Sequence, residues 1–170
     1  MDKILLIDDE ADILRVLSMS LRADGYRVVT AASGEEGLEL FKREPPDIVL
    51  TDIKMPGMDG IEVLKQIKAL SDEVEVIMVT GHGDIDSAIE SLQSGASDFI
   101  NKPVRDSALA VSLQRAHEKI DIKRRLKAYT HELEDTVALA TLELRRRSNF
   151  QIKLIRSSND GIVATDRELN

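Results

Sequence analysis

The sequence predicts an α/β protein built on a doubly wound sheet of five parallel strands, with helices on both faces. Short apolar runs rich in β-branched residues recur five times before residue 104. They are mostly apolar on both faces, as strands buried between two helix layers are. Amphipathic stretches with helical spacing separate the runs, and this repeated alternation of strand and helix is typical of doubly wound sheets.

Each apolar run predicts one strand, and each stretch between two runs predicts one helix. The expected strands are "KILLID" (3–8), "YRVVTA" (26–31), "DIVLTD" (47–52), "EVIMVT" (75–80) and "SDFIN" (97–101). In the first helix, Ile13, Val16, Leu17 and Leu21 form an apolar stripe, and Gly25 follows at a C-cap position. The other three helices are marked by Leu38 and Phe41 before Pro45-Pro46, by Ile61, Val63, Leu64 and Ile67, and by Ile85, Ala88, Ile89 and Leu92.

A long helix is expected after Pro103, because residues 104–150 contain no Gly or Pro and alternate charged with apolar residues. Three pairs of apolar residues lie seven apart, and the phase slips near Ile120–Leu126: the pairs are Leu113 and Ile120, Leu126 and Leu133, and Val137 and Leu144. This pattern predicts an interrupted coiled coil. A second copy of the chain is the expected partner, and a helix folded back on itself is the alternative.

The tail turns β-like at "GIVATD" (161–166) and then stops. The roughly twenty residues after 150 are too few to bury a core of their own. They are therefore expected to begin a further domain, which would make this chain a fragment of a longer protein.

Composition excludes several classes of function. The chain has no cysteine, which excludes disulfides, thiol catalysis and thiolate zinc sites. The net charge of −8 is the sum of −11 over residues 1–104 and +3 over residues 105–170, so the acidic first part argues against direct binding of nucleic acid. No apolar run approaches the ~20 residues of a membrane helix. A cytoplasmic protein, with no membrane segment in this fragment, is expected.

Polar groups follow four of the expected strands. Asp8 and Asp9 follow the first strand, Asp52 ends the third, Thr80 ends the fourth, and Lys102 follows the fifth. In a doubly wound sheet the carboxyl ends of the strands form the ligand site, so these groups should meet at one edge. Oxygen ligands of this kind suit Mg²⁺. An ionised Asp52 beside Mg²⁺ would be a nucleophile for a phosphoryl group, with Lys102 and Thr80 binding its oxygens.

Four motifs at these positions are "LLIDDE", "DIVLTDIKMPGMDGIEVL", "VIMVTGHGD" and "GASDFINKPV". In this order and spacing, residues 2–120 resemble the receiver domain of bacterial response regulators. The resemblance implies the flavodoxin-like strand order 2-1-3-4-5, with the fifth helix extended into a coiled coil. It also implies a phosphorylation-controlled switch in two-component signal transduction.

The resemblance assigns roles to individual residues. Asp52 would accept the phosphoryl group from the phosphohistidine of a sensor histidine kinase or a phosphotransfer protein. Asp9, Asp52 and the backbone carbonyl of Lys54 would contact Mg²⁺, with Asp8 helping through water. Thr80 and Lys102 would bind the phosphoryl group, Thr80 and Phe99 would act as the switch pair, and the Lys102-Pro103 peptide bond would be cis.

The second part of the chain carries further resemblances. "LEDTVALATLELRRRSNFQ" is similar to signalling helices, and "LIRSSNDGIVATDREL" resembles the opening of a PAS domain. The implied organisation is a receiver domain over 1–120, a coiled-coil helix over 121–150 that forms a homodimer, and the start of a PAS-like domain over 151–170. This order resembles the front of hybrid sensor histidine kinases. The fragment itself would catalyse only its own phosphotransfer and dephosphorylation.

Two other functions stay open from the residues alone. An aspartyl-nucleophile phosphatase needs a second Asp two positions after the nucleophile, and Lys54 occupies that position. A dimerisation scaffold with an inactive receiver is the second alternative, and the intact set of acids and lysine argues against it. His131-Glu132 is similar to the phosphorylated His-Glu pair of histidine kinases, but Glu134, Asp135 and Thr136 replace the residues that follow it there.

Overall fold

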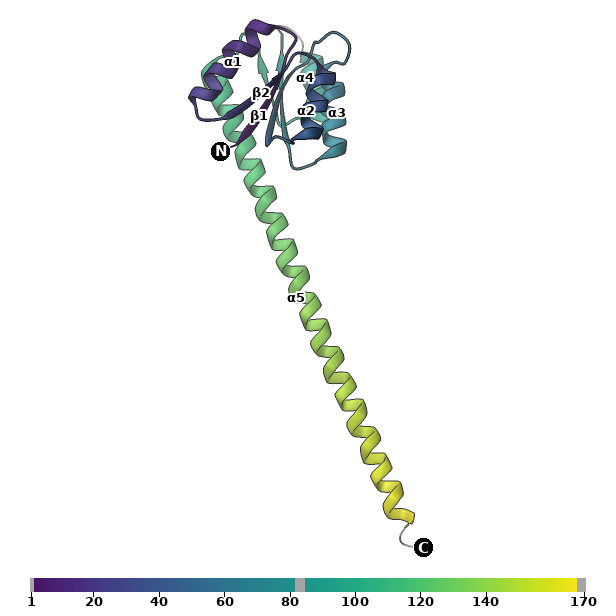
Figure 1. Cartoon of the computed structure of the whole chain (residues 1–170). Coiled ribbons are helices and arrows are strands. Elements are labelled where there is room, and N and C mark those ends of the chain that lie inside the picture. The colour runs from purple at the N-terminus through teal and green to yellow at the C-terminus, as the bar shows by residue number, and fades with distance from the viewer. Residues whose placement is uncertain (1, 82–84, 168–170) are drawn as a thin grey trace. The chain divides into compact units, whose positions relative to one another are not determined.

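The structure, a computed structural model, describes residues 2–81 and 85–167, with side chains described as far as residue 156 (Figure 1). It consists of two units, Met1–Lys123 and Arg124–Asn170. His82, Gly83 and Asp84 of the third sequence motif lie outside the described residues.

The first unit is the predicted doubly wound sheet. Its strands are β1 (Lys3–Ile7), β2 (Arg27–Ala31), β3 (Ile48–Asp52), β4 (Glu75–Thr80) and β5 (Asp98–Asn101). They are paired in parallel in the order β2-β1-β3-β4-β5, which confirms the expected topology. The connecting helices are α1 (Ala11–Ala23), α2 (Gly34–Arg43), α3 (Gly60–Leu70) and α4 (Ile85–Gln93).

Alternate residues of the strands point into two separate cores, because successive side chains of a strand face opposite sides of the sheet. Ile4 and Leu6 pack with α1 and with the first part of α5 (Asp106–Arg167). Leu5 and Ile7 pack with α2 and α3 on the other face. Gly25 follows α1 with φ of +92°, as expected for a glycine after a helix.

Helix α5 continues without a break to Arg167, well past the receiver-like unit. The fold-back alternative is therefore wrong for the described residues. The β-like segment "GIVATD" also lies within the helix, so that expectation is wrong as well. A strand needs neighbouring strands for its backbone hydrogen bonds, and this chain supplies none there, whereas a helix satisfies its own.

The second unit consists of the remainder of α5. Every side chain described between residues 124 and 156 is exposed, and apolar residues alternate with charged ones. Across the described part of the chain, α5 included, no helix combines the length and apolarity needed to span a membrane.

Gly60 fixes the distance between the start of α3 and the end of β3. Its N–H donates to the Ile53 carbonyl at 2.8 Å, and Asp59 caps the helix by accepting from the Glu62 N–H at 2.8 Å. A Cβ at position 60 would collide with the carbonyl oxygen of Asp52. Only glycine allows the helix to start this close to the strand that carries Asp52.

We therefore expect Gly60→Ala to lower the free energy of unfolding by about 1–3 kcal/mol, because the backbone of Asp52 must move to admit the methyl group. Urea unfolding followed by circular dichroism measures this. Gly81→Ala is the matched control, since a Cβ at position 81 meets nothing within 4 Å. Equal stability of the two variants would contradict the assigned role of Gly60.

Candidate functional site

Parallel register brings four strand ends to one edge of the sheet. Ile7 of β1 lies beside Thr51 of β3, so Asp8 follows β1 next to Asp52 at the end of β3. On the other side, the N–H of Lys102 donates to the Thr80 carbonyl at 2.7 Å, which ties the chain after β5 to the end of β4. Residues far apart in the sequence therefore meet because their strands end together.

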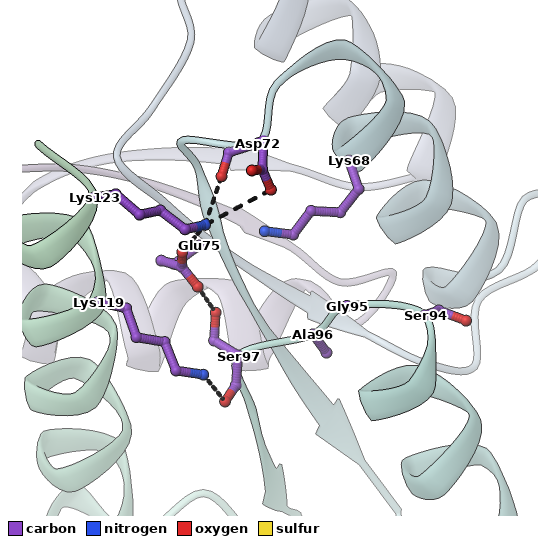
Figure 2. Close-up of a pocket in the computed structure, with 9 residues that line it drawn as sticks. All are labelled: Lys68, Asp72, Glu75, Ser94, Gly95, Ala96, Ser97, Lys119 and Lys123. Atoms are coloured by element: carbon purple, nitrogen blue, oxygen red, sulfur yellow. Dashed lines mark hydrogen bonds and ion pairs between the residues drawn. The ribbon is translucent and has the colours of Figure 1, made fainter. Parts of the chain in front are cut away.

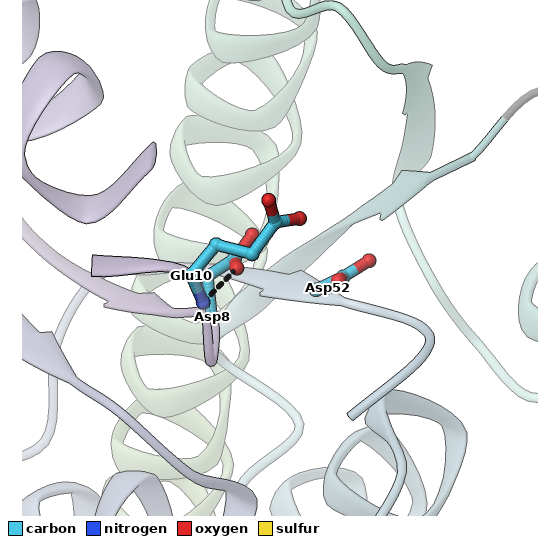
Figure 3. A group of neighbouring side chains, drawn as sticks. All are labelled: Asp8, Glu10 and Asp52. Carbon is cyan, nitrogen blue, oxygen red and sulfur yellow. Dashed lines mark hydrogen bonds between the residues drawn. The ribbon is translucent and has the colours of Figure 1, made fainter. Parts of the chain in front are cut away.

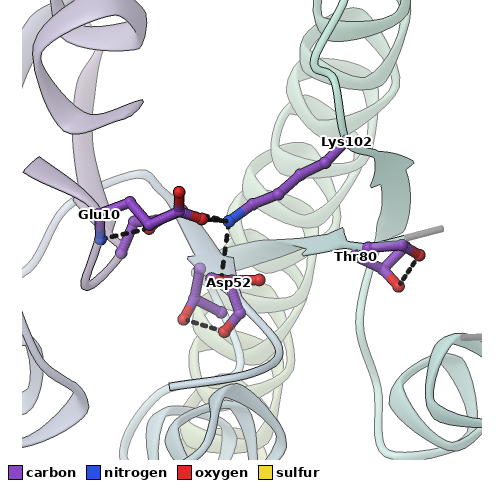
Figure 4. Close-up of polar contacts among 7 residues, drawn as sticks. Glu10, Asp52, Thr80 and Lys102 are labelled. Atoms are coloured by element: carbon purple, nitrogen blue, oxygen red, sulfur yellow. Dashed lines mark hydrogen bonds and ion pairs between the residues drawn. The ribbon is translucent and has the colours of Figure 1, made fainter. Parts of the chain in front are cut away.

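The centre of the site is the ammonium group of Lys102, which contacts three carboxylates. Figure 4 shows its contacts with Glu10 and Asp52, and Figure 3 shows the three acids together. Its Nζ lies 3.0 Å from Asp8 Oδ2, 2.9 Å from Glu10 Oε1 and 2.9 Å from Asp52 Oδ2. The Asp8 and Asp52 side chains are buried, with exposed fractions of 2% and 7%. Lys102 therefore neutralises carboxylates that would otherwise repel one another with little water to screen them.

The pKa values of two groups reflect this crowding. Burial lowers the pKa of Lys102, but hydrogen bonds to Asp52, Glu10 and Asp8 raise it more, and the net pKa lies well above its ordinary value. Burial raises the pKa of Asp8 above 3.8, although the backbone N–H of Glu10 and the ammonium of Lys102 both lower it. Lys102 is thus held in its charged form, whereas the ionised form of Asp8 is disfavoured.

The donor set fits a hard divalent cation. One oxygen each from Asp8, Glu10 and Asp52 lies within 4.8 Å of the others, and Asp8 and Asp52 are held by the sheet (Figure 3). Carboxylate oxygens at such an edge are the ligands that Mg²⁺ prefers, with water completing its coordination. A divalent cation would also stabilise the ionised form of Asp8, whose pKa is raised by burial and, to a smaller extent, by repulsion from Asp52.

Glu10 belongs to this cluster, although only Asp8 and Asp9 of the acidic run were expected as metal ligands. It is the third acid after β1, its side chain is 60% exposed, and it reaches back to Lys102. The expected ligand Asp9 is exposed and lies outside the three-carboxylate group. Asp9 instead lines a neighbouring open hollow of about 590 Å³, together with Lys54 and Asp59. The sequence shows the acidic run "DDE" (8–10), but it does not show which of the three side chains faces Lys102.

The two residues expected to act as a switch lie on β4 and β5. The Thr80 hydroxyl is 3.3 Å from the carbonyl oxygen of Gly81, and it points away from Lys102 and Asp52 (Figure 4). Phe99 lies beside Met78 of β4 in the sheet, with 38% of its surface exposed. The Lys102-Pro103 peptide bond is cis, as expected.

A second polar cluster, which the sequence does not predict, lies at the opposite end of β4 (Figure 2). The Glu75 carboxylate is 2% exposed and accepts from Lys123 Nζ at 2.6 Å and from the Ser97 hydroxyl. The same ammonium donates to the Asp72 carbonyl at 2.6 Å, and Lys119 donates to the Ser97 carbonyl at 2.9 Å. These bonds attach the receiver-unit part of α5 to β4 and to the residue before β5. Glu75 is already neutralised, so this cluster is structural.

The main site can therefore do one kind of chemistry well. It presents a carboxylate at Asp52, a fixed ammonium at Lys102 and an acidic pair that suits a divalent cation. Phosphoryl transfer needs little more than such positioning and neutralisation of charge. The Thr51 hydroxyl donates to the backbone carbonyl of Asp52 at 3.1 Å and not to its side chain, so the Asp52 carboxylate itself is the group available to react.

Curated proteins with similar sequences are transcriptional regulators. The chain is 41% identical over 116 residues to the C4-dicarboxylate transport transcriptional regulatory protein DctD of Rhizobium meliloti, covering 68% of this chain and 25% of that protein. It is 42% identical over 120 residues to the probable transcriptional regulator ycf27 of Porphyridium aerugineum, covering 71% and 50%. The chain thus spans a quarter to a half of the length of these relatives.

Solved structures agree with this relationship. A response regulator receiver domain protein from Clostridium thermocellum is 39% identical, with a TM-score of 0.68 over 74% of this chain and 99% of that one. NtrX from Brucella abortus is 34% identical, with a TM-score of 0.71 over 74% of this chain and 29% of that one. The sequence pattern of the response regulator receiver domain family matches residues 4–114. The chain belongs to the response regulator receiver domain family.

Proposed function

We propose that Asp52 accepts a phosphoryl group from the phosphohistidine of a sensor histidine kinase or a phosphotransfer protein. The observation that carries this proposal is the contact of the buried Asp52 carboxylate with Lys102 at the edge where Asp8 and Glu10 also lie. An oxygen of Asp52 attacks phosphorus, the bond from phosphorus to the histidine nitrogen breaks, and the imidazole leaves. The product is an acyl phosphate on Asp52.

The neighbouring residues have separate tasks in this proposal. Asp8 and Asp52, with Asp9 and the backbone carbonyl of Lys54, hold Mg²⁺, and Glu10 is an additional candidate ligand. When bound, Mg²⁺ neutralises the charge that develops on the phosphoryl oxygens. Lys102 exchanges part of its contact with the acids for a phosphoryl oxygen. Water is limited because Asp8 and Asp52 are buried.

Thr80 and Phe99 are proposed to convert phosphorylation into a change of surface. The Thr80 hydroxyl now bonds the carbonyl of Gly81, a weak contact at 3.3 Å that a charged phosphoryl oxygen can replace. Thr80 lies beside Asn101 in the sheet, two residues along β5 from Phe99. Movement of Thr80 toward Asp52 would make room for Phe99 to turn inward from its half-exposed position.

The phosphodonor is proposed to dock a helix on the apolar surface beside Lys102. A groove of about 290 Å³ is lined by Ile13, Val16, Pro103 and Val104, and Lys102 itself forms part of its wall. Val16 is 62% exposed. Because Lys102 lines the groove and also contacts Asp52, a helix bound there can present a phosphohistidine to Asp52.

We further propose that the signal passes through α5 to a downstream module. The organisation is a receiver domain over 1–120, a coiled-coil helix over 121–150 that pairs with a second copy, and a PAS-like domain that starts within 151–170. The exposed apolar side chains of the second unit support the pairing. The sequence "LIRSSNDGIVATDREL" supports a PAS domain and a histidine kinase output, although the relatives named above are transcriptional regulators.

Asp52→Asn should abolish phosphorylation, because the amide cannot form the acyl phosphate. The chain is incubated with Mg²⁺ and acetyl phosphate, and intact-mass spectrometry counts added phosphoryl groups. Wild type should gain one group, and Asp12→Asn, an exposed acid on α1, should behave like wild type. Labelling of Asp52→Asn would contradict the proposal. Rapid hydrolysis without an adduct would indicate a phosphatase, and no reaction of wild type an inactive scaffold.

Asp8→Asn should stabilise the metal-free protein at pH 7. The raised pKa of Asp8 means that its ionised form costs stability once the pH exceeds the unfolded value near 3.8. Below that pH both states hold the proton, so the variant should lose its advantage. Added Mg²⁺ should make wild type more stable than Asp8→Asn. A Mg²⁺ concentration of about 100 times the Kd raises the free energy of unfolding of wild type by about 2.7 kcal/mol. Urea unfolding with Mg²⁺ or with EDTA measures both effects, and Mg²⁺ stabilising both proteins equally would exclude Asp8 as a ligand.

Val16→Asp should slow phosphotransfer from a protein donor about tenfold, because a charge would be placed in the proposed docking groove. Labelling by acetyl phosphate should not change, since the small donor needs no groove. Leu70→Asp, at an exposed site on α3, is the matched control. An equal loss with both donors would show damage to the site rather than to docking.

A further inference from the structure

The second unit carries a continuous apolar face on a single helix. Six residues form this face and are called the stripe: Leu126, Tyr129, Leu133, Val137, Ala140 and Leu144. Its five larger members are each 58–68% exposed. Most of the stability of helices in proteins comes from packing an apolar face. Nothing in the described part of the second unit packs on this one, so another chain must cover it.

The spacing of the stripe is eleven residues, not seven. Leu126, Tyr129 and Leu133 are followed eleven positions later by Val137, Ala140 and Leu144. The surrounding sequence repeats with the same period, as "THEL" at 130–133 and "TLEL" at 141–144. Eleven residues in three turns is about 3.67 residues per turn, close to the 3.6 of a relaxed helix. The face therefore stays on one side of the helix across both repeats.

A seven-residue repeat would select a different surface. Continued from Leu126, Tyr129 and Leu133, it would bring Thr136 and Glu143 onto the face. The eleven-residue repeat replaces them with Val137 and Leu144, which are apolar. The two apolar heptads of the sequence, 126–133 and 137–144, are thus parts of two longer repeats.

The threonines beside the stripe form hydrogen bonds within their own helix. The Thr130 hydroxyl donates to the Leu126 carbonyl at 2.9 Å, and the Thr141 hydroxyl donates to the Val137 carbonyl at 2.8 Å. Thr136, which lies off the stripe, makes the same i−4 bond to Glu132, so the bond does not by itself mark the period. Because each hydroxyl is satisfied within its own helix, a partner surface can cover it without losing a hydrogen bond to water.

We infer that the stripe is the contact between two copies of this chain, parallel and in register, packed on the eleven-residue repeat. The inference rests on the dimer in the proposed function and names its face and its period. Parallel pairing sets each of the six stripe residues against its own copy. Ile155, eleven residues after Leu144 and 65% exposed, then meets its own copy as one further apolar layer, while Ser148 and Gln151 occupy the other two positions of that third repeat. An antiparallel pair that matches the six layers leaves Ile155 outside them.

Three consecutive arginines next to the stripe disfavour the parallel pair. The run Arg145–Arg147 lies near its own copy in a parallel pair, and the like charges repel. The repulsion is between exposed groups, so salt screens it. The proposed packing also predicts the hand of the pair. A period of eleven gives a slight right-handed supercoil, whereas heptads give a left-handed one.

Cysteine cross-linking tests the face directly, because the chain contains no native cysteine. Leu133→Cys and Leu144→Cys are made separately in the full chain, with Asp135→Cys and Glu143→Cys as exposed neighbours off the stripe. Under mild oxidation, the two stripe variants should form covalent dimers at least about tenfold faster than the two controls. Rapid self-cross-linking at both positions requires a parallel, in-register pair, because an antiparallel pair can bring only one of two positions eleven residues apart opposite its own copy.

The possible results distinguish a wrongly assigned contact face from the absence of a dimer. Faster cross-linking at Glu143→Cys than at Leu144→Cys would replace the eleven-residue face with a heptad face. Failure of Leu133→Cys while the wild type sediments as a dimer would overturn the parallel register. A wild-type monomer at high concentration would overturn this inference and the proposed dimer together. Phosphorylation of Asp52 by acetyl phosphate would still stand.

A substitution supplies a second measurement that does not depend on oxidation. Leu133→Lys should raise the Kd of the dimer at least about 100-fold, because it places two charges in a paired layer. Ala128→Lys adds the same charge on the opposite face and should leave the Kd within a few-fold of wild type. Analytical ultracentrifugation measures both, and labelling of Asp52 confirms that both variants are folded. Equal effects at positions 128 and 133 would overturn the assigned face.

Discussion

The contact between Lys102 and three carboxylates is the interaction on which the site depends. Asp8 and Asp52 are buried at the end of neighbouring strands, and two such charges are stable together only beside a cation. Lys102 supplies that cation from the end of β5, and its own backbone is tied to β4. The same crowding explains why the site suits a divalent ion and why the pKa of Asp8 is raised. A site that holds excess negative charge is ready to exchange one cation for another.

The rest of the first unit serves to keep these groups in place. Two cores, one on each face of the sheet, bury the strands β1, β3 and β4. Gly60 lets α3 begin against the backbone of Asp52, so the strand that carries Asp52 has little freedom to shift. At the other end of the sheet, buried Glu75 binds Lys123 of α5 and Ser97 before β5. The strands that carry the site are therefore fixed at both ends, and rearrangement is left to side chains such as Thr80.

The second unit follows a different physical rule. The receiver unit has two apolar cores of its own, whereas the described side chains of the helix after Lys123 are exposed. Such a helix gains most of its stability when another surface covers its apolar face. The proposed pairing therefore adds an association-dependent segment to a domain that has its own core. In the proposed function, a change at α5 alters this pairing without unfolding the domain that carries Asp52.

Local periodicity predicts the succession of strands and helices along the chain, whereas the strand order in the sheet was implied by the family resemblance. Because parallel strands end together, the sequence also predicts that Asp8, Asp52 and Lys102 meet at one edge. Tertiary structure alone decided that Glu10, not Asp9, joins Lys102, since the choice depends on the path of the chain after β1. It also decided the burial of Glu75, whose partner Lys123 is 48 residues away and leaves no local signal. The "GIVATD" segment shows that local propensity can also mislead. Its residues favour a strand, but they lie in a helix, and no strand among the described residues of the second unit pairs with them.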